Sequence, residues 1–135
     1  MFANFSTPEL ALAALEDAYV RKDLDAAVAA KDFRFEAREM LLNLQNLAEH
    51  IDDALVSQAA GVLELAFRQQ IQVMGFPEFG TLKCQVISKR DLRDDLVELV
   101  EECTFPDGGR SRQTLHASKN EMGWHIVVLP PKTQS

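Results

Sequence analysis

The chain has only two cysteines, and the features that it lacks narrow the functions open to it. Cys84 and Cys103 have no CxxC spacing, so the sequence predicts neither a disulfide framework nor a zinc site, and we expect two reduced, buried thiols. No apolar stretch approaches the roughly 20 residues that a membrane-spanning helix needs. Residues 1–6 also lack the basic segment and apolar run of a signal peptide. We therefore predict a cytoplasmic protein that does not engage a membrane.

Basic residues are scarce as well. Lysine and arginine number 14 against 21 aspartates and glutamates, which gives a formal net charge of −7. Such a chain repels a phosphate backbone, so we predict no nucleic-acid partner. An acidic surface suits a basic protein partner, although many solvated acidic surfaces have none. No glycine-rich phosphate loop is present, because Gly108-Gly109 reads as a hairpin turn without a following helix, and we predict no cofactor.

The first half of the chain has the 3.6-residue apolar period of helices. At 135 residues the chain is long enough for one hydrophobic core and too short for two ordinary domains, so we predict a single domain over 1–135. Pro8 suits the first position of a helix, Asp23 can cap the next, and Gly75 can end the last. The sequence predicts four helices. The first begins at residue 8, the second covers 23–30, the third runs from 33 to about 50, and the fourth runs from 52 or 53 to 75.

After residue 80 the apolar period changes to two, which is typical of strands. Leu82, Cys84 and Val86 alternate with polar residues, as a half-buried strand requires. Turn residues then separate four segments. We predict strands from 82 to a turn at 91–94, over 96–105, over 110–118, and over 124–129. The fold class is therefore α+β, with N-terminal helices packed on a four-stranded antiparallel sheet.

Both ends of the chain carry a family resemblance. The first helix with Tyr19, the joint 22–26 (KDLDA) and the closing hairpin segment 123–127 (GWHIV) together resemble the NTF2-like superfamily, also called SnoaL-like or cystatin-like cone proteins. The resemblance implies a curved sheet that wraps a helix around a cone-shaped cavity. Members include isomerases, cyclases, dehydratases, transport factors and toxin-immunity proteins. One departure is that 33–37 runs straight into a helix, where the family has a short strand, so we expect extra helix to fill the cone.

Glu101 is the most informative candidate for chemistry. Alternation places it on the same strand face as Val97 and Leu99, and a carboxylate in an apolar cone would have a raised pKa and could act as a general acid or base. Alternatively, a bulge would turn it outward. Tyr19, by resemblance to some isomerases of the superfamily, could help form an oxyanion hole, or its ring could simply pack. The predicted pocket lining is Leu82, Val97, Leu99, Phe105 and Trp124.

The two histidines of the last hairpin are expected on the outer face of the sheet. His116 and His125 have no evident third ligand, so we predict no metal site and interpret them as part of a polar or interface patch. Members of the superfamily often dimerise through this face, and we predict a homodimer. The predicted interface residues are Ile87, Leu96, Val100, His116, His125 and Val127.

Two functional hypotheses follow. The leading one is a non-catalytic binding protein of NTF2-like fold, such as a toxin-neutralising immunity protein that acts by protein contact. Its acidic contacts would be Asp52, Asp53, Asp91, Asp94, Asp95, Glu98 and Glu102. The alternative is a small-molecule-binding protein or an isomerase or cyclase that uses the cone, with Tyr19 and Glu101 at its wall. The first hypothesis favours a protein that is not an enzyme.

Overall fold

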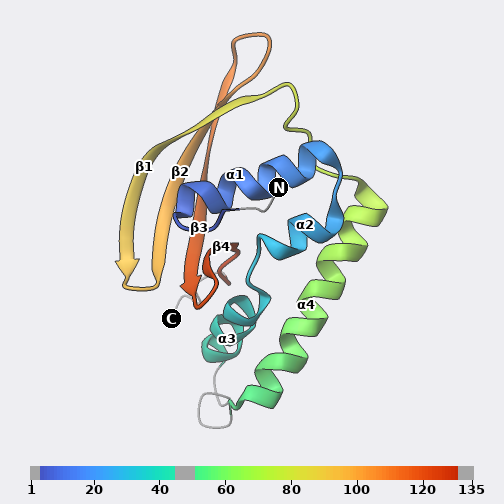
Figure 1. Ribbon diagram of the computed structural model, residues 1–135, viewed down its shortest axis with the longest axis vertical. Helices are drawn as coiled ribbons and strands as arrows, with labels where there is room; N and C mark the ends of the chain where they lie inside the picture. The colour runs from blue at the N-terminus through green and yellow to red at the C-terminus, as the bar shows by residue number, and fades with distance from the viewer. Residues whose placement is uncertain (1–3, 45–50, 131–135) are drawn as a thin grey trace.

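The computed structural model, which describes residues 4–44 and 51–130, places four helices before four strands (Figure 1). The helices are α1 (Pro8–Arg21), α2 (Leu24–Ala29), α3 (Phe33–Asn43) and α4 (Asp53–Met74). The strands are β1 (Lys83–Arg93), β2 (Leu96–Thr104), β3 (Arg110–Asn120) and β4 (Gly123–Val127). They pair antiparallel in the order β1-β2-β3-β4. The predicted α+β class is confirmed.

Each helix begins where a side-chain oxygen accepts a hydrogen bond from a backbone N–H of the first turn. Thr7, Asp23, Asp32 and Asp52 are these caps. Helix α3 ends at Asn43, earlier than the period predicts, and the rest of its predicted extension, 45–50, lies outside the described residues. None of the helices described, including the 22-residue α4, is apolar enough over its length to cross a membrane.

Strand β1 is longer than the sequence indicates. We predicted a turn at 91–94, but the chain stays paired with β2 until Arg93 and turns at Asp94-Asp95. Two register shifts, one around Ile87 and one around Leu92, interrupt this pairing. A bulge adds a residue to one strand and increases the local twist, so the strand can bend without losing its partner. This bending gives the sheet the concave face seen beside α1 (Figure 1).

Helix α1 lies across that concave face, which we call the inner face of the sheet. The main hydrophobic cluster joins the two layers. Its buried members are Ala11, Leu12, Leu15 and Ala18 of α1, Ala27 and Ala30 near α2, and Val97, Leu99, Ala117 and Ile126 of the sheet. Burying a large aliphatic side chain contributes about 1.5–3 kcal/mol, so this contact is a major part of the fold's stability.

Helices α3 and α4 form an antiparallel pair outside the cone. They enclose a second cluster that is centred on Phe33, Ala37, Leu41, Val56 and Ala60. Helix α4 packs on α3 and α2, on the side away from the sheet (Figure 1). The expectation that this extra helix fills the cone is therefore wrong: α1 covers the inner face, the helical pair forms an additional layer, and α4 reaches the main cluster through Phe67.

A buried ion pair links this additional layer to the sheet. Lys31 Nζ lies 2.8 Å from Glu36 Oε2, and the two side chains are only 6% and 10% exposed. The same Glu36 oxygen accepts a hydrogen bond from the Val128 N–H at 3.1 Å. The Lys31 ammonium also lies 5.5 and 5.4 Å from the ring centres of Phe33 and Phe67, within range of a cation–π interaction. The pair thus ties α3 to the end of the sheet.

Replacing Lys31 with methionine tests this link, because methionine keeps the apolar stem and removes the charge. We expect Lys31→Met to lower the free energy of unfolding by about 3–5 kcal/mol, since Glu36 would stay buried without its counterion. Arg21→Met is the matched control, because Arg21 pairs with Asp17 at the surface and such pairs contribute less than about 1 kcal/mol. Urea denaturation measures both; equal losses would contradict the assigned role.

Candidate functional site

Glu101 faces α1 from the middle of β2. Residues alternate along β2, so that Val97, Leu99, Glu101 and Cys103 are buried on the inner face. The nearby register shift lies in β1, around Ile87, and β2 keeps its regular alternation. The alternative that a bulge turns Glu101 outward is therefore wrong. Its side chain is 2% exposed, an unusual environment for a carboxylate.

Helix α1 brings a second glutamate to the same place. Glu16 is close enough to Glu101 for a side-chain hydrogen bond between the two carboxyl groups. Burial first, then that hydrogen bond and the charge of Glu101, raise the pKa of Glu16 to about 9. When both groups are ionised, Glu16 Oε2 is buried with no donor facing it. A proton on Glu16 relieves this conflict, so the pair is stable with a single shared proton.

Two further polar side chains border the carboxyl pair. Gln113 of β3 lies opposite Glu101 in the register, and its Nε2 donates a hydrogen bond to Glu101 Oε1 at 2.6 Å. Tyr19 lies one helical turn beyond Glu16 on α1. Burial, and secondarily the charge of Glu16, raise the pKa of Tyr19 to about 12, so its hydroxyl stays protonated. Glu16, Tyr19, Glu101 and Gln113 form what we call the carboxyl site.

Aromatic rings cover one side of this site. The Tyr19 ring lies 5.9 Å from the ring centre of Phe79 and 6.2 Å from that of Phe76, both in the segment that follows α4. These distances are typical of attractive aromatic pairs. The rings are half-buried, so the site combines acidic groups with partly accessible apolar surface.

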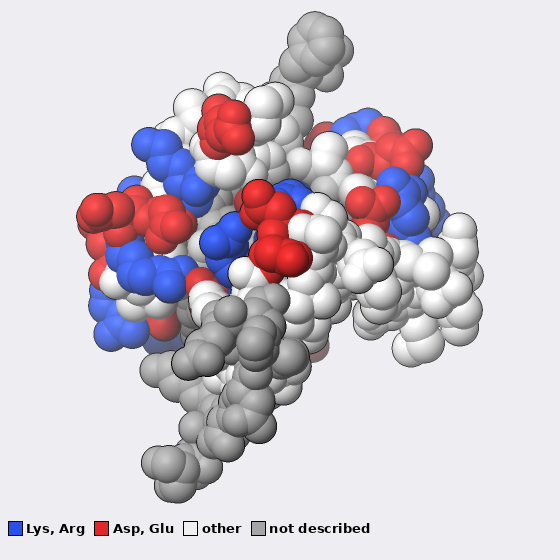
Figure 2. Space-filling view, turned by 90° about the horizontal axis from the view of Figure 1, so that it is seen from below, with Lys and Arg blue, Asp and Glu red and all other residues white. Residues whose placement is uncertain are grey.

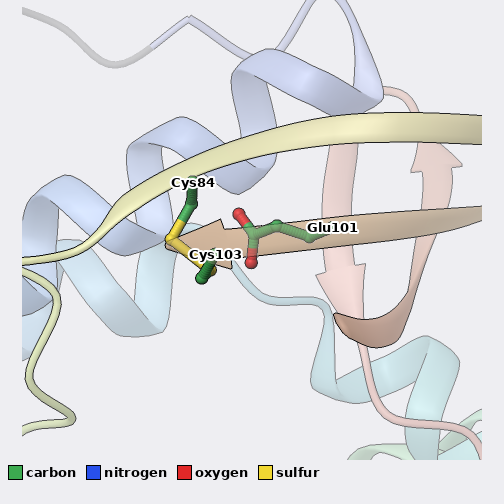
Figure 3. Close-up of side chains that lie close together, drawn as sticks. All are labelled: Cys84, Glu101 and Cys103. Carbon is green, nitrogen blue, oxygen red and sulfur yellow. A yellow bond between two sulfur atoms is a disulfide. The ribbon is translucent and has the colours of Figure 1, made fainter. Parts of the chain in front are cut away.

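The two cysteines form a disulfide beside Glu101, which corrects the expectation of two reduced thiols. Cys84 of β1 and Cys103 of β2 are direct partners in the register, with Cα atoms 4.0 Å apart. The Glu101 carboxylate is directed toward the disulfide from β2 (Figure 3). Strand alternation already places both cysteines on the inner face of adjacent strands, where we interpreted them as apolar filling; only the register shows that they are direct partners.

The residues predicted to line a cavity lie in different environments. Val97 and Leu99 are buried in the cluster beneath α1, Leu82 and Trp124 are half-buried, and Phe105 is 40% exposed. A pocket of about 910 Å³ lies instead on the other side of α1, where the N-terminal segment and α2 border it. Its lining residues include Phe5, Leu10, Ala14, Asp17, Arg21 and Ala26. It does not include the five predicted residues.

The predicted outer-face residues are only partly available to a partner. Leu96, His125 and Val127 are buried within the chain itself, and the His125 ring stacks on Phe5 with ring centres 4.7 Å apart. His116 Nε2 lies 3.8 Å from Glu98 Oε2, and burial lowers the pKa of His116, with Glu98 acting in the opposite direction. A partner on this face would meet mainly Ile87, Val100 and His116.

Much of the predicted acidic surface is neutralised within the chain. Glu98 pairs with Arg90, Asp53 lies near Arg34 and Arg38, and the remaining pairs are Glu102 with Arg110 and Arg112, and Asp95 with Arg93. Acidic and basic side chains accordingly intermingle on the face shown in Figure 2. The net charge is therefore not gathered into a patch on this face that would attract a basic protein.

Glu16 is the site residue that sequence reasoning missed. A signal was present: Glu16 follows Leu12 by four residues and precedes Tyr19 by three, which places it on the apolar side of α1. Chemically, the site offers a protonated carboxyl group that can donate a hydrogen bond and a carboxylate that can accept a proton. It can also offer two negative oxygens to a cation.

The pKa of Glu16 makes stability depend on pH. Unfolding returns Glu16 to an ordinary value of 4.5, so its contribution is complete below that pH and is lost as pH rises toward about 9. We expect wild type to lose stability relative to Glu16→Gln between pH ~5 and ~8. The loss should be at most about 1.4 kcal/mol per pH unit, and less because solvent screens this partly exposed side chain.

Urea denaturation over this pH range measures the difference. Glu121→Gln, the same change in the exposed β3–β4 turn, is the control and should track wild type. A constant difference between Glu16→Gln and wild type at all pH values would show that Glu16 ionises normally.

Comparisons with known proteins match only solved structures. No protein-family model and no curated protein matches the chain. An NTF2-like protein from Campylobacter jejuni is 12% identical (TM-score 0.42), with 87% of this chain and 94% of that chain covered. An NTF-2 like protein of unknown function from Shewanella oneidensis MR-1 is 18% identical (TM-score 0.43; coverage 86% and 88%). A cystatin-like domain from Nostoc punctiforme PCC 73102 is 13% identical (TM-score 0.42; coverage 94% and 75%). These three structures are described as NTF2-like or cystatin-like in fold.

Proposed function

We propose that this chain is a small-molecule-binding protein whose carboxyl site takes an organic cation, namely an amine attached to an apolar ring or chain. The observation that carries the proposal is the buried carboxyl pair: when Glu16 is ionised its Oε2 has no donor facing it, and neither Glu16 nor Glu101 forms an ion pair with a lysine or arginine in the described part of the chain. Buried carboxylate oxygens are normally paired with donors or cations. An ammonium group supplies both the charge and the N–H donors that this arrangement lacks.

Aromatic rings on the Tyr19 side of the carboxyl pair would contact the rest of such a ligand. Tyr19, Phe76 and Phe79 present half-buried rings, which attract cations through their faces and apolar groups through their area. Gln113 already donates a hydrogen bond to one oxygen of Glu101, so the ligand needs to supply donors only to the remaining carboxyl oxygens. The proposal develops the cone-binding alternative from the sequence and keeps its two residues, Tyr19 and Glu101, and adds Glu16.

Three naphthalene probes of equal size and different charge test the proposal. They are 1-naphthylmethylamine, 1-naphthalenemethanol and 1-naphthoate, each titrated into the oxidised protein and followed by NMR. We expect the amine to bind at least about tenfold more tightly than the alcohol, because a hydrogen bond to a charged group is worth roughly 1.5–3 kcal/mol. The anion should not bind. The largest shifts should occur at Glu16, Tyr19 and Glu101.

Two isosteric variants assign the binding to the site. Glu101→Gln should weaken amine binding to the level of the alcohol, whereas Glu102→Gln, the neighbouring change on the other side of β2, should leave it unchanged. Equal affinity for amine and alcohol, or an equal effect of the two variants, would rule out recognition by the carboxyl site.

A protein partner is the second candidate, and the outer side of α4 favours it. Val62, Leu65, Val73 and Met74 are 67%, 55%, 82% and 78% exposed, and exposed apolar residues gathered on one element are typical of contact surfaces. In the predicted homodimer, the interface would be formed by these α4 residues or by the remaining outer-face residues, Ile87, Val100 and His116. A cytoplasmic location stays part of the proposal. No contact among the described residues specifically supports an immunity role or an enzymatic role.

A further inference from the structure

Three atoms that can ligate a metal meet beside the carboxyl site. The Sγ atoms of Cys84 and Cys103 and a carboxylate oxygen of Glu101 all lie within 4.8 Å of one another. They come from neighbouring positions of β1 and β2 and share the inner face (Figure 3). In the oxidised chain the two sulfur atoms bond to each other and are not available as ligands.

We infer that reduction of the Cys84–Cys103 disulfide creates a zinc site made of both thiolates and Glu101. A small thiol or dithiol reductant supplies two electrons and two protons, the S–S bond breaks, and two thiols form while the reductant becomes a disulfide. Zn²⁺ then displaces both protons to solvent and binds two thiolates and one carboxylate oxygen. Water takes the fourth position.

The geometry suits a tetrahedral ion. Zinc binds sulfur at ~2.3 Å and carboxylate oxygen at ~2.0–2.2 Å, so its ligand atoms lie roughly 3.3–3.8 Å apart. The three ligand atoms already lie within 4.8 Å of one another, so small side-chain shifts would bring them to these distances once the S–S bond opens. Because all three residues belong to two paired strands, the sheet holds their backbones in place.

Two groups beside Glu101, Gln113 and Glu16, suit a cation bound to its carboxylate. Gln113 Nε2 holds Glu101 Oε1, which is the kind of outer contact that orients a metal-binding carboxylate. Glu16 lies beside Glu101, and when it is ionised its buried Oε2 has no donor facing it. A divalent cation bound to Glu101 would attract the Glu16 oxygen and offset the cost of burying both glutamates.

The inference adds zinc binding by the reduced chain to the proposed function, and it does not rest on amine binding by the oxidised chain. Organic amines would bind the oxidised chain, whereas zinc would bind the reduced one. In a cytoplasm, as the sequence predicts, small thiols keep cysteine pairs reduced, so the zinc form would predominate there. Outside such a compartment the disulfide would close the site.

Metal titration of the reduced and oxidised full chain tests the inference. Co²⁺ serves as a spectroscopic probe, because thiolate coordination produces an intense charge-transfer absorption, and Zn²⁺ affinity is measured by competition with a chromophoric chelator. We expect one metal ion per reduced chain and affinity at least about a hundredfold lower in the oxidised chain. Equal binding by the two forms, or no binding by the reduced form, would overturn the inference.

Variants then assign the ligands. Glu101→Gln should lower zinc affinity at least about tenfold, and Glu102→Gln on the opposite side of β2 should not change it. Cys84→Ser should abolish the charge-transfer absorption. Circular dichroism checks that each variant folds; if Cys84→Ser does not fold, the comparison of Glu101→Gln with Glu102→Gln still decides. Equal affinity of those two variants would exclude Glu101 as a ligand, and failure of the amine titration would leave this result unaffected.

Discussion

The structure depends on one packing contact, in which α1 covers the concave inner face of the sheet. Leu12 and Leu15 of the helix meet Val97 and Leu99 of β2 in the centre of the core. When the helix packs on the sheet, the side chains on their facing surfaces are all removed from water. The apolar residues gain from this burial, and the glutamates that lie among them are forced into each other's neighbourhood.

Burying two carboxyl groups opposes this packing, and the chain offsets the cost locally. Gln113 donates to one oxygen of Glu101, and Glu16 retains its proton well above the pH at which a carboxyl group normally ionises. Loss of that proton would leave one buried acceptor oxygen, Glu16 Oε2, without a donor. Two carboxyl groups buried side by side are costly to retain in a core, and this is the reason to propose a function here and not at the pocket outside α1.

The two proposals assign ligands of different chemistry to the same surroundings because the disulfide forms part of them. With Cys84 and Cys103 bonded, the site is a pair of carboxyl groups beside aromatic rings. With the cysteines reduced, two soft sulfur ligands join Glu101. Helices α3 and α4 contribute no residue to the carboxyl site: the Lys31–Glu36 pair joins α3 to the end of the sheet, and α4 packs on α3 and α2.

The register of β1 and β2 decided between the two faces open to Glu101, whereas the sequence by itself determined the type and order of the helices and strands. Apolar periods of 3.6 and 2 are local properties, and the caps at Thr7, Asp23 and Asp52 act within one turn, so these features need no tertiary information. Tertiary structure alone decided the partners of Glu101 and the place of the α3–α4 pair. Glu16, Cys84 and Gln113 come from three other elements, and their approach depends on the bulge in β1 and on how α1 crosses the sheet. Such long-range geometry leaves no periodic mark in the sequence, because it results from the packing of whole elements and not from the spacing of neighbouring residues.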